Sequence, residues 1–290
     1  MSTPDVRSIL GAILGGLFFV ILPFWISATA FSTPSVPLIG MVAGFLLMGI
    51  VTGYFSTQET VAEPYMGAIV TSVIAYVVFA PMELPSLQGL DDGQFQPLFI
   101  LTCINGLVAT FAGAWTGEKL QRTYAQPGAS HLAWGWVMAG TVLGVGTVLF
   151  LVSVLVSIFG FSSGTGTLLA QTKIWTLALA LAFGTGFAGF FSALRSPGDT
   201  ANETILSGLV TATLVFDLFY FGLGGEEVVS SLGLAAAVGI GLVASLLGGL
   251  FGEEMQNHME QAATAQQPAG ASPTTHPSPK EVQERSSVEM

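Results

Sequence analysis

The sequence predicts an all-α, polytopic membrane protein with eight transmembrane helices arranged as two parallel four-helix repeats and a disordered C-terminal tail. Charged residues make up only 9% of the chain and hydrophobic residues 51%, whereas a soluble domain has roughly 25% charged residues. Apolar runs recur at close to the ~20 residues that cross ~30 Å of hydrocarbon. A third observation, a duplicated apolar segment, predicts the repeat.

The duplicated segment reads GLVATFAGAWTGE at 106–118 and GLVASLLGGLFGE at 241–253. The two copies align without a gap, and seven of the thirteen positions are identical. Self-similarity of this kind is the signature of a repeated structural unit. We therefore expect one four-helix repeat over 1–126, a second over 129–254 and a tail over 255–290.

The first apolar run, Ile9 to Ala30, has two interpretations. An arginine before it and the Ala-Thr-Ala at its end resemble a secretory signal with its cleavage site. However, GAILGG at 11–16 is echoed by GTVLGV at 140–145, inside the chain, where no signal peptide lies. The echo favours an uncleaved first helix, and it matches Gly11 and Gly15 with Gly140 and Gly144.

Seven more spans follow the first, separated by clusters of turn-forming residues. They are expected at about 38–55, 64–84, 97–117, 132–159, 172–192, 204–223 and 229–251. The second and sixth spans share a Gly-aromatic-Phe-Ser motif, GYFS at 53–56 and GFFS at 189–192. An even number of helices in each repeat predicts that both repeats face the same way, about a pseudo-twofold axis along the membrane normal.

Lysine and arginine set the expected orientation, because they accumulate on the cytoplasmic side. With the N-terminus inside, only Lys173 lies outside, and the other six lie inside: Arg7, Lys119, Arg122, Arg195, Lys280 and Arg285. We predict a cell-membrane protein with both termini in the cytoplasm. Residues 260–290 have almost no large apolar side chains, so this part of the tail is expected to be disordered.

Two pairs of acidic residues precede the third and seventh spans, Glu59 with Glu63 and Asp199 with Glu203. They are interpreted either as acidic groups around a cytoplasmic mouth that attract cations, or as helix caps. Thr60-x-x-Glu63 and Thr200-x-x-Glu203 both have the capping-box pattern, and carboxylates suit a helix N-terminus.

Asp217 is an acidic residue within a predicted span, where a charge costs ~2.5–3.5 kcal/mol unless it faces a cavity or a partner. Thr102 and Asn105 form a second polar spot in the fourth span. These three residues are candidates for a substrate path. The glycines of the duplicated segment are candidates for close helix packing: Gly106, Gly113, Gly117, Gly241, Gly248 and Gly252.

Other classes of function find little support in the sequence. One cysteine and three histidines predict neither a disulfide nor a metal site, and no cofactor is expected. The absence of a basic patch argues against nucleic acid. Because no catalytic motif is present, we expect a protein that is not an enzyme.

One repeat resembles small glycine-rich, four-span membrane proteins of archaea and bacteria that have no assigned function. The resemblance lies in LPFWIS and PLIGMVAGFLLMGIVTGYFS, within 22–56, and in the glycine-rich fourth span. It implies a location in the membrane without implying an activity.

The first functional hypothesis is permeation or transport of a small solute or ion between the two repeats, since internal duplication and intramembrane acids are frequent in transporters. The alternative is a non-transporting scaffold in the bilayer, whose acidic tail recruits a cytoplasmic protein. The sequence does not predict the oligomeric state.

Overall fold

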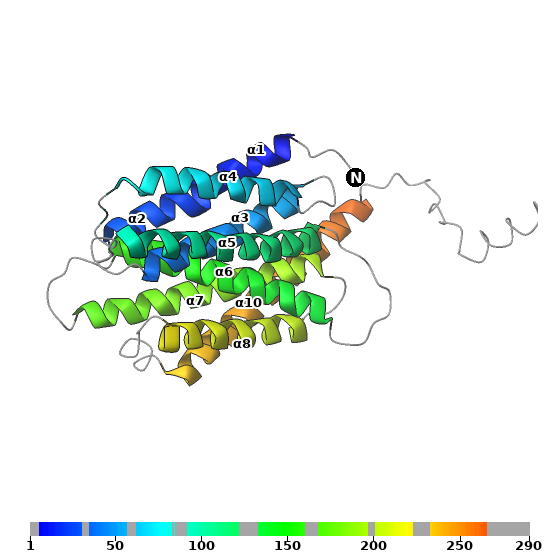
Figure 1. Cartoon of the computed structure of the whole chain (residues 1–290). Helices are drawn as coiled ribbons and strands as arrows, with labels where there is room; N and C mark the ends of the chain where they lie inside the picture. The colour runs from blue at the N-terminus through cyan, green and yellow to red at the C-terminus, as the bar shows by residue number, and fades with distance from the viewer. Residues whose placement is uncertain are drawn as a thin grey trace, which may run out of the picture. The chain divides into compact units, whose positions relative to one another are not determined.

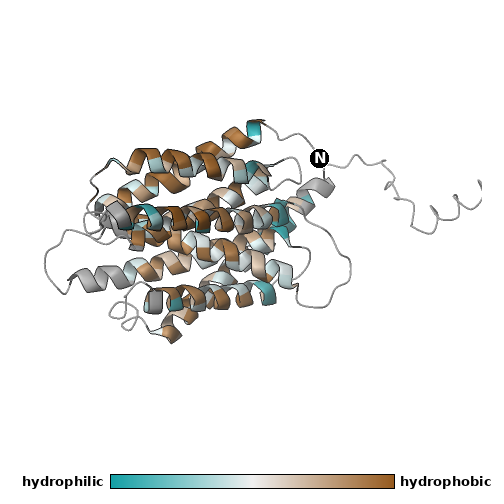
Figure 2. Cartoon of the chain, in the orientation of Figure 1, coloured by the Kyte–Doolittle hydropathy of each residue, from teal (hydrophilic) through white to brown (hydrophobic). Residues whose placement is uncertain are grey.

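A computed structural model describes residues 6–30, 35–56, 62–82, 84, 92–121, 133–159, 168–196, 201–222 and 233–265. All regular secondary structure in these residues is helical, and eight segments are long and apolar enough to cross a membrane. Hydrophobic residues run along the helices, and hydrophilic residues gather mainly towards the helix ends (Figure 2). The chain is therefore a polytopic α-helical membrane protein surrounded by lipid.

The first span contains three consecutive helical elements, and each later span is one helix, extended in one case by a π turn (Figure 1). The elements are α1 (Val6–Gly16), η1 (Leu17–Ile21), α2 (Leu22–Ala30), α3 (Ser35–Phe55), α4 (Ala62–Phe79), α5 (Asp92–Gln121), α6 (Trp134–Phe159), α7 (Leu168–Arg195), α8 (Ala201–Asp217), η2 (Leu218–Gly222) and α10 (Leu234–Ala265).

The first apolar run packs into the bundle as a helix, with Ala12 and Phe24 fully buried. Its π turn, η1, ends two residues before Pro23. Proline has no N–H to donate to the carbonyl of Phe19 one turn earlier, so a local change of helical pitch at this point has a clear cause. The Phe19 carbonyl instead lies against Gly44 of α3.

Helix α10 continues to Ala265, which corrects the expectation of a disordered tail from residue 255. The reason is local: EEMQNHMEQAATA at 253–265 is dominated by residues with high helix propensity. The rest of the predicted tail, 266–290, lies outside the described residues. The chain divides into a compact unit up to Glu253 and a second unit from Glu254, and the contacts below concern the first.

The contacts of the first and fifth spans recur in the two halves of the chain. A Cβ on Gly16 would meet the side chain of Thr71 in α4, and a Cβ on Gly144 would meet that of Thr211 in α8. Gly16 therefore takes the place of Gly144, whereas the sequence match had assigned Gly15 to it. That register is wrong by one residue, because adjacent glycines make either match plausible.

The second and sixth spans also correspond, in a register that differs from the predicted one. Gly113 of α5 lies against the carbonyl of Leu46, and Gly248 of α10 lies against that of Gly186. At the ends of the same helices, the N–H groups of Ser56 and Ser196 donate to carbonyls four residues earlier. The match of GYFS with GFFS is thus displaced by four residues. One helical turn is 3.6 residues, so this displacement leaves the motif on nearly the same face.

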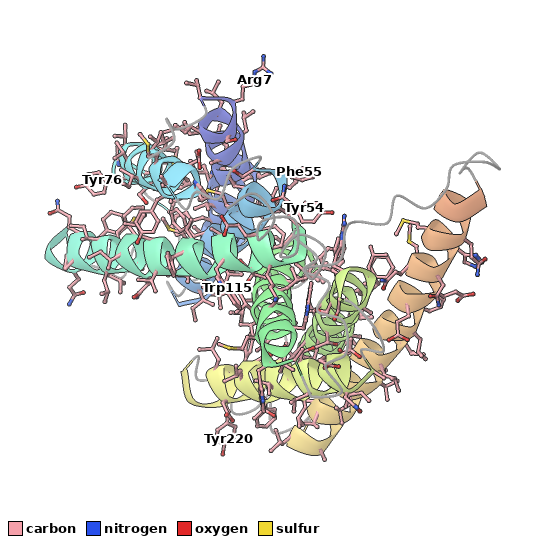
Figure 3. The ribbon with its side chains drawn as sticks, turned by 90° about the vertical axis from the view of Figure 1, so that its right-hand side faces the viewer. Arg7, Tyr54, Phe55, Tyr76, Trp115 and Tyr220 are labelled. Carbon is pink, nitrogen blue, oxygen red and sulfur yellow. The ribbon has the colours of Figure 1, made fainter. Side chains whose placement is uncertain are left out.

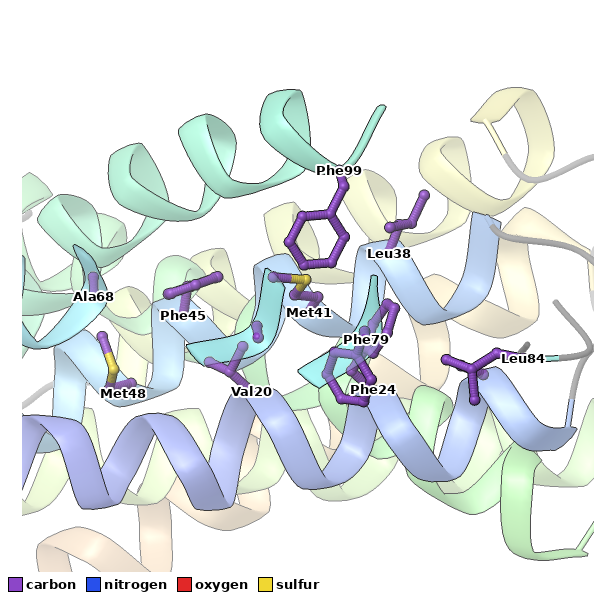
Figure 4. Close-up of a cluster of buried hydrophobic side chains, with 12 residues drawn as sticks. Val20, Phe24, Leu38, Met41, Phe45, Met48, Ala68, Phe79, Leu84 and Phe99 are labelled. Carbon is purple, nitrogen blue, oxygen red and sulfur yellow. The ribbon is translucent and has the colours of Figure 1, made fainter. Parts of the chain in front are cut away.

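Buried hydrophobic side chains form one cluster in each half and a third cluster between the halves. In the first half, Phe24 packs against Phe79 at 4.6 Å between ring centroids and against Phe99 at 6.2 Å (Figure 4). The cluster between the halves joins α3 and α5 to α6 and α7, through residues such as Leu47, Leu120 and Trp136.

The two halves contribute different faces to their common interface. The first half contributes α3, α5 and α2, and the second contributes α6 and the end of α7. A twofold axis would pack α7 against the first span in the same way as α3 packs against α6, and the described residues do not show this packing. The expected pseudo-twofold relationship is therefore wrong, because local helix patterns do not determine which outer face of a bundle meets its neighbour.

Candidate functional site

The three candidates for a substrate path lie apart in the described part of the chain. Thr102 is buried on α5, and its hydroxyl donates to the carbonyl of Leu98 in the same helix at 2.8 Å. Asn105 is exposed on the same helix, and Asp217 is exposed at the last residue of α8. Because Thr102 is buried and bonded within its own helix, whereas Asn105 and Asp217 are exposed, the three side chains do not line one buried path.

The four acidic candidates divide into two described and two undescribed residues. Glu59 and Asp199 lie outside the described residues. Glu63 is fully buried in the first turn of α4, and Glu203 is 8% exposed in the first turn of α8. An acidic mouth needs carboxylates that face water, and both of these side chains are directed into the protein.

Glu203 has an identified partner on another helix. Its Oε1 atom accepts a hydrogen bond of 2.9 Å from the backbone N–H of Ala133. The carbonyl of Ala133 in turn accepts the N–H of Trp136 at 2.8 Å, so Ala133 is the N-cap residue of α6. The carboxylate thus satisfies a donor at the start of α6, where the helix dipole also favours negative charge. This bond caps α6 and not α8, the helix to which the predicted capping box of Thr200 and Glu203 referred, and Thr200 lies outside the described residues.

The six candidate packing glycines all lie directly against another helix. A Cβ on Gly117 would meet the carbonyl oxygen of Ile50, and one on Gly252 would meet that of Phe190. Gly106 lies against the ring of Phe45, and Gly241 against Ala212. Gly241 thus faces α8. Gly113 and Gly117 line a seam of close backbone contact between α3 and α5, and Gly248 and Gly252 line a second seam between α7 and α10. We call these the glycine seams.

In each half of the chain, a hydroxyl group close to the glycine seam forms a hydrogen bond to a neighbouring helix. Ser245 of α10 donates to the carbonyl of Thr204 in α8 at 2.6 Å. Thr110, which aligns with Ser245 in the duplicated segment, donates to the carbonyl of Phe45 at 3.3 Å and to that of Gly106 at 2.9 Å. Small residues and interhelical hydroxyl bonds together are the features that hold helices close in lipid.

Two cation–aromatic contacts lie where α3, α5 and α7 end and α6 begins. Arg195 donates to the hydroxyl of Tyr54, and its guanidinium carbon lies 5.3 Å from the centre of that ring. The ammonium nitrogen of Lys119 lies 5.2 Å from the centre of the Trp136 ring. Tyr54 and Phe55 are labelled near this end of α3 in Figure 3. The sequence indicated both cations as orientation signals, but it has no pattern that names their aromatic partners.

Neither protein-family profiles nor solved structures provide a match for the chain. A similarity exists with the dolichyl-monophosphooligosaccharide–protein glycotransferase AglB of Haloferax volcanii, 31% identical over 147 residues. This stretch covers 46% of the present chain and 13% of AglB. The chain therefore spans a small part of the length of that protein, and the similarity does not place it in a family.

The match corrects one expectation from the sequence. A protein that is not an enzyme was expected because no catalytic motif is present, and the similarity is to a transferase. The exclusion is therefore wrong. Motifs that depend on short, fixed spacings are informative when present, whereas their absence does not separate a membrane protein from enzymes whose reacting groups lie on distant segments.

Proposed function

We propose that this protein is a membrane scaffold, a rigid helical module that holds an enzyme of glycan transfer at the bilayer. The observation that carries the proposal is the pair of glycine seams, in which backbone meets backbone in both halves of the chain. Helices in lipid gain little from hydrophobic burial against each other, so contacts at this distance provide much of the stability of the bundle. Such a bundle suits a structural role.

The placement of the polar candidates supports the same proposal. A path for a solute needs polar groups that converge between the halves. Apolar side chains such as Leu47, Ile50 and Leu143 form a cluster between the halves, and the polar contact of Arg195 with Tyr54 joins the ends of α7 and α3. Asp217 and Asn105 are exposed elsewhere on the described surface. Transport stays a hypothesis from the sequence, and this geometry gives it less support than a scaffold.

The class of partner comes from the similarity to AglB. By its name, that protein transfers an oligosaccharide from a dolichyl monophosphate carrier to protein. A chain that resembles only 13% of such a transferase suits the part of a membrane module that works beside a catalytic protein. We expect the recruiting segment to be the polar tail that follows α10, at 266–290. The second candidate, which the same match favours, is a direct part in glycan transfer.

Co-purification with a glycan-transfer assay separates these two candidates. The full chain is purified from its native membrane in mild detergent, and transfer from a dolichyl-phosphate-linked oligosaccharide to an acceptor peptide is measured. A scaffold should bring transfer activity with it, and a chain without residues 266–290 should lose that activity while it keeps its fold. Activity in the chain purified to homogeneity would favour direct transfer instead. Native preparations without transfer activity contradict both candidates.

Flux into proteoliposomes tests the transport hypothesis separately. The scaffold proposal expects no flux of common ions or small metabolites above that of empty vesicles. Flux that falls in the variant Asp217→Asn would overturn it and restore Asp217 as part of a path. The matched control is Thr213→Val, because Thr213 lies on the same helix and its hydroxyl donates to the carbonyl of Leu209 at 2.9 Å.

A further inference from the structure

The two halves contact each other through surfaces that are not equivalent. The positions that one half buries in this contact have equivalent positions in the other half, and several of these equivalents are exposed. The recurring contacts establish the correspondence, with α6 equivalent to the first span, α7 to α3 and α10 to α5. Gly144 corresponds to Gly16, and Ser196 to Ser56. Every other position along these helices follows from the same registers.

The side that the second half uses to contact the first is the outer side of α6. Gly146 lies against the side chains of Leu46 and Leu47, and Ser153 lies against Gly40. The first half presents the equivalent positions of its first span to the outside. Gly146 corresponds to the exposed Phe18, while Ser153 is 1% exposed and its equivalent, Trp25, is 49% exposed. We call the row formed by Leu14, Phe18, Leu22 and Trp25 the first-span face.

The side that the first half uses is the outer side of α3, and its equivalent on α7 is exposed over part of its length. Gly40, which lies against Ser153, corresponds to Ala180, which is fully buried. Leu47 is 8% exposed, whereas its equivalent, Phe187, is 46% exposed. Ala43 is buried and corresponds to the exposed Phe183. On the neighbouring helices, the buried Thr116 corresponds to the exposed Phe251. We call the surface formed by Phe183, Phe187 and Phe251 the α7 face.

A contact between two unlike surfaces of repeated units is called heterologous. When two such units meet, the first surface stays unused on one unit and the second surface stays unused on the other. In Figure 1, α1 and α4 lie at one edge of the bundle and α8 and α10 at the other. The first-span face and the α7 face are the two unused surfaces. Each bears a row of large apolar side chains about one helical turn apart, a spacing that allows the rows of two helices to interlock.

We propose that a second copy of this chain packs its first-span face against the α7 face of the first copy, which repeats between molecules the contact that joins the halves. The internal interface is the argument for this occupant, because it shows that the folded unit binds another such unit through these two positions. Phe18 of one copy then meets Phe187 of the next, as Gly146 meets Leu47 within the chain. Aromatic pairs of this kind contribute packing energy where hydrophobic burial contributes little.

Repetition of one heterologous contact produces a closed ring if the rotation between units divides a full turn, and an open series if it does not. In both arrangements the contact joins unlike faces of neighbouring copies. The inference concerns assembly alone and does not depend on the proposed role in glycan transfer.

Cysteine cross-linking in native-like membranes tests the contact. The native cysteine is first removed with Cys103→Ala. One chain then carries Phe18→Cys with one affinity tag, and a second carries Phe187→Cys with a different tag. Oxidation of the co-expressed chains should produce a linked pair that carries both tags, and a chain with both substitutions should produce dimers and larger products. Both positions are exposed, so the variants are expected to fold.

The control pair is Val77→Cys with Leu214→Cys, since these residues are exposed on α4 and α8, outside the interface between the halves. It should link several-fold less than the test pair. Three results would overturn the proposal. The absence of a link for the test pair would mean that lipid alone covers these faces, and equal linking of the control pair would mean random collision. Links between two chains that carry the same tag would mean a symmetric contact between identical faces.

Discussion

The carboxylate of Glu203, in the first turn of α8, accepts the backbone N–H of Ala133 at the start of α6. Two helices separated by the whole of α7 are thus joined at their first residues. Because the bond satisfies a donor that α6 cannot satisfy itself, the position of this carboxylate fixes where α6 begins relative to α8.

Replacement of Glu203 should destabilise the protein, and the loss should be smaller when the new side chain can still accept the hydrogen bond from Ala133. We expect Glu203→Ala to lower the free energy of unfolding by about 1–3 kcal/mol, since a buried donor loses its partner. Glu203→Gln keeps an oxygen acceptor and loses only the charge, so its effect should be smaller, about 0.3–1 kcal/mol. Unfolding in mixed micelles measures both. Asn202→Ala, at an exposed neighbour, is the control, and a loss as large as that of Glu203→Ala would contradict the argument.

The variant Gly248→Ala, which adds a methyl group to the glycine seam between α7 and α10, should destabilise the protein. A Cβ on Gly248 would collide with the carbonyl oxygen of Gly186, and such overpacking costs about 1–3 kcal/mol. Gly239→Ala on the same helix is the matched control, because no atom lies within 4 Å of the added carbon. The control should be neutral or stabilise α10 by up to ~1 kcal/mol. If unfolding measurements gave both variants the same stability, the conclusion that helices pack closely at Gly248 would be wrong.

The two buried hydroxyls of Ser245 and Thr102 should differ in importance. Ser245 bonds to another helix at 2.6 Å, whereas Thr102 bonds to a carbonyl of its own helix at 2.8 Å. Interhelical hydrogen bonds in membranes average about 0.6 kcal/mol and reach about 1.7 kcal/mol. We expect Ser245→Ala to lose stability within that range and Thr102→Val to lose less. A larger loss for Thr102→Val would show that this hydroxyl has a role beyond its own helix.

Arg195 and Tyr54 connect the ends of α7 and α3 across the two halves. We expect Tyr54→Phe to lose about 1.5–3 kcal/mol, the contribution of a hydrogen bond to a charged group, while it keeps the ring under the guanidinium. Arg195→Lys should also destabilise the protein, since an ammonium group does not reproduce the planar stacking of arginine. The double variant measures the coupling: strictly additive losses would mean that the two side chains do not act together.

The path candidates show where prediction from the sequence was weakest. Asp217 attracted attention because it was assigned to the interior of a span. It does lie within the span Ala201–Tyr220, close to its end, but its side chain is exposed and does not face the rest of the protein. A hydropathy profile locates a span to within a few residues and does not indicate which side of the helix faces the protein. By contrast, the packing glycines were identifiable, because close approach in lipid has few chemical solutions and small residues are the principal one.

By itself, the sequence determined that the chain crosses a membrane eight times as helices, because the thickness of the hydrocarbon layer and the cost of unpaired backbone groups in it leave no other structure for such apolar runs. The tertiary structure alone decided the helix registers, the partner of Glu203 and the unlike faces that join the halves. These depend on contacts between residues far apart in the chain. A helical pattern that repeats every 3.6 residues marks a buried face and carries no information about which partner covers it.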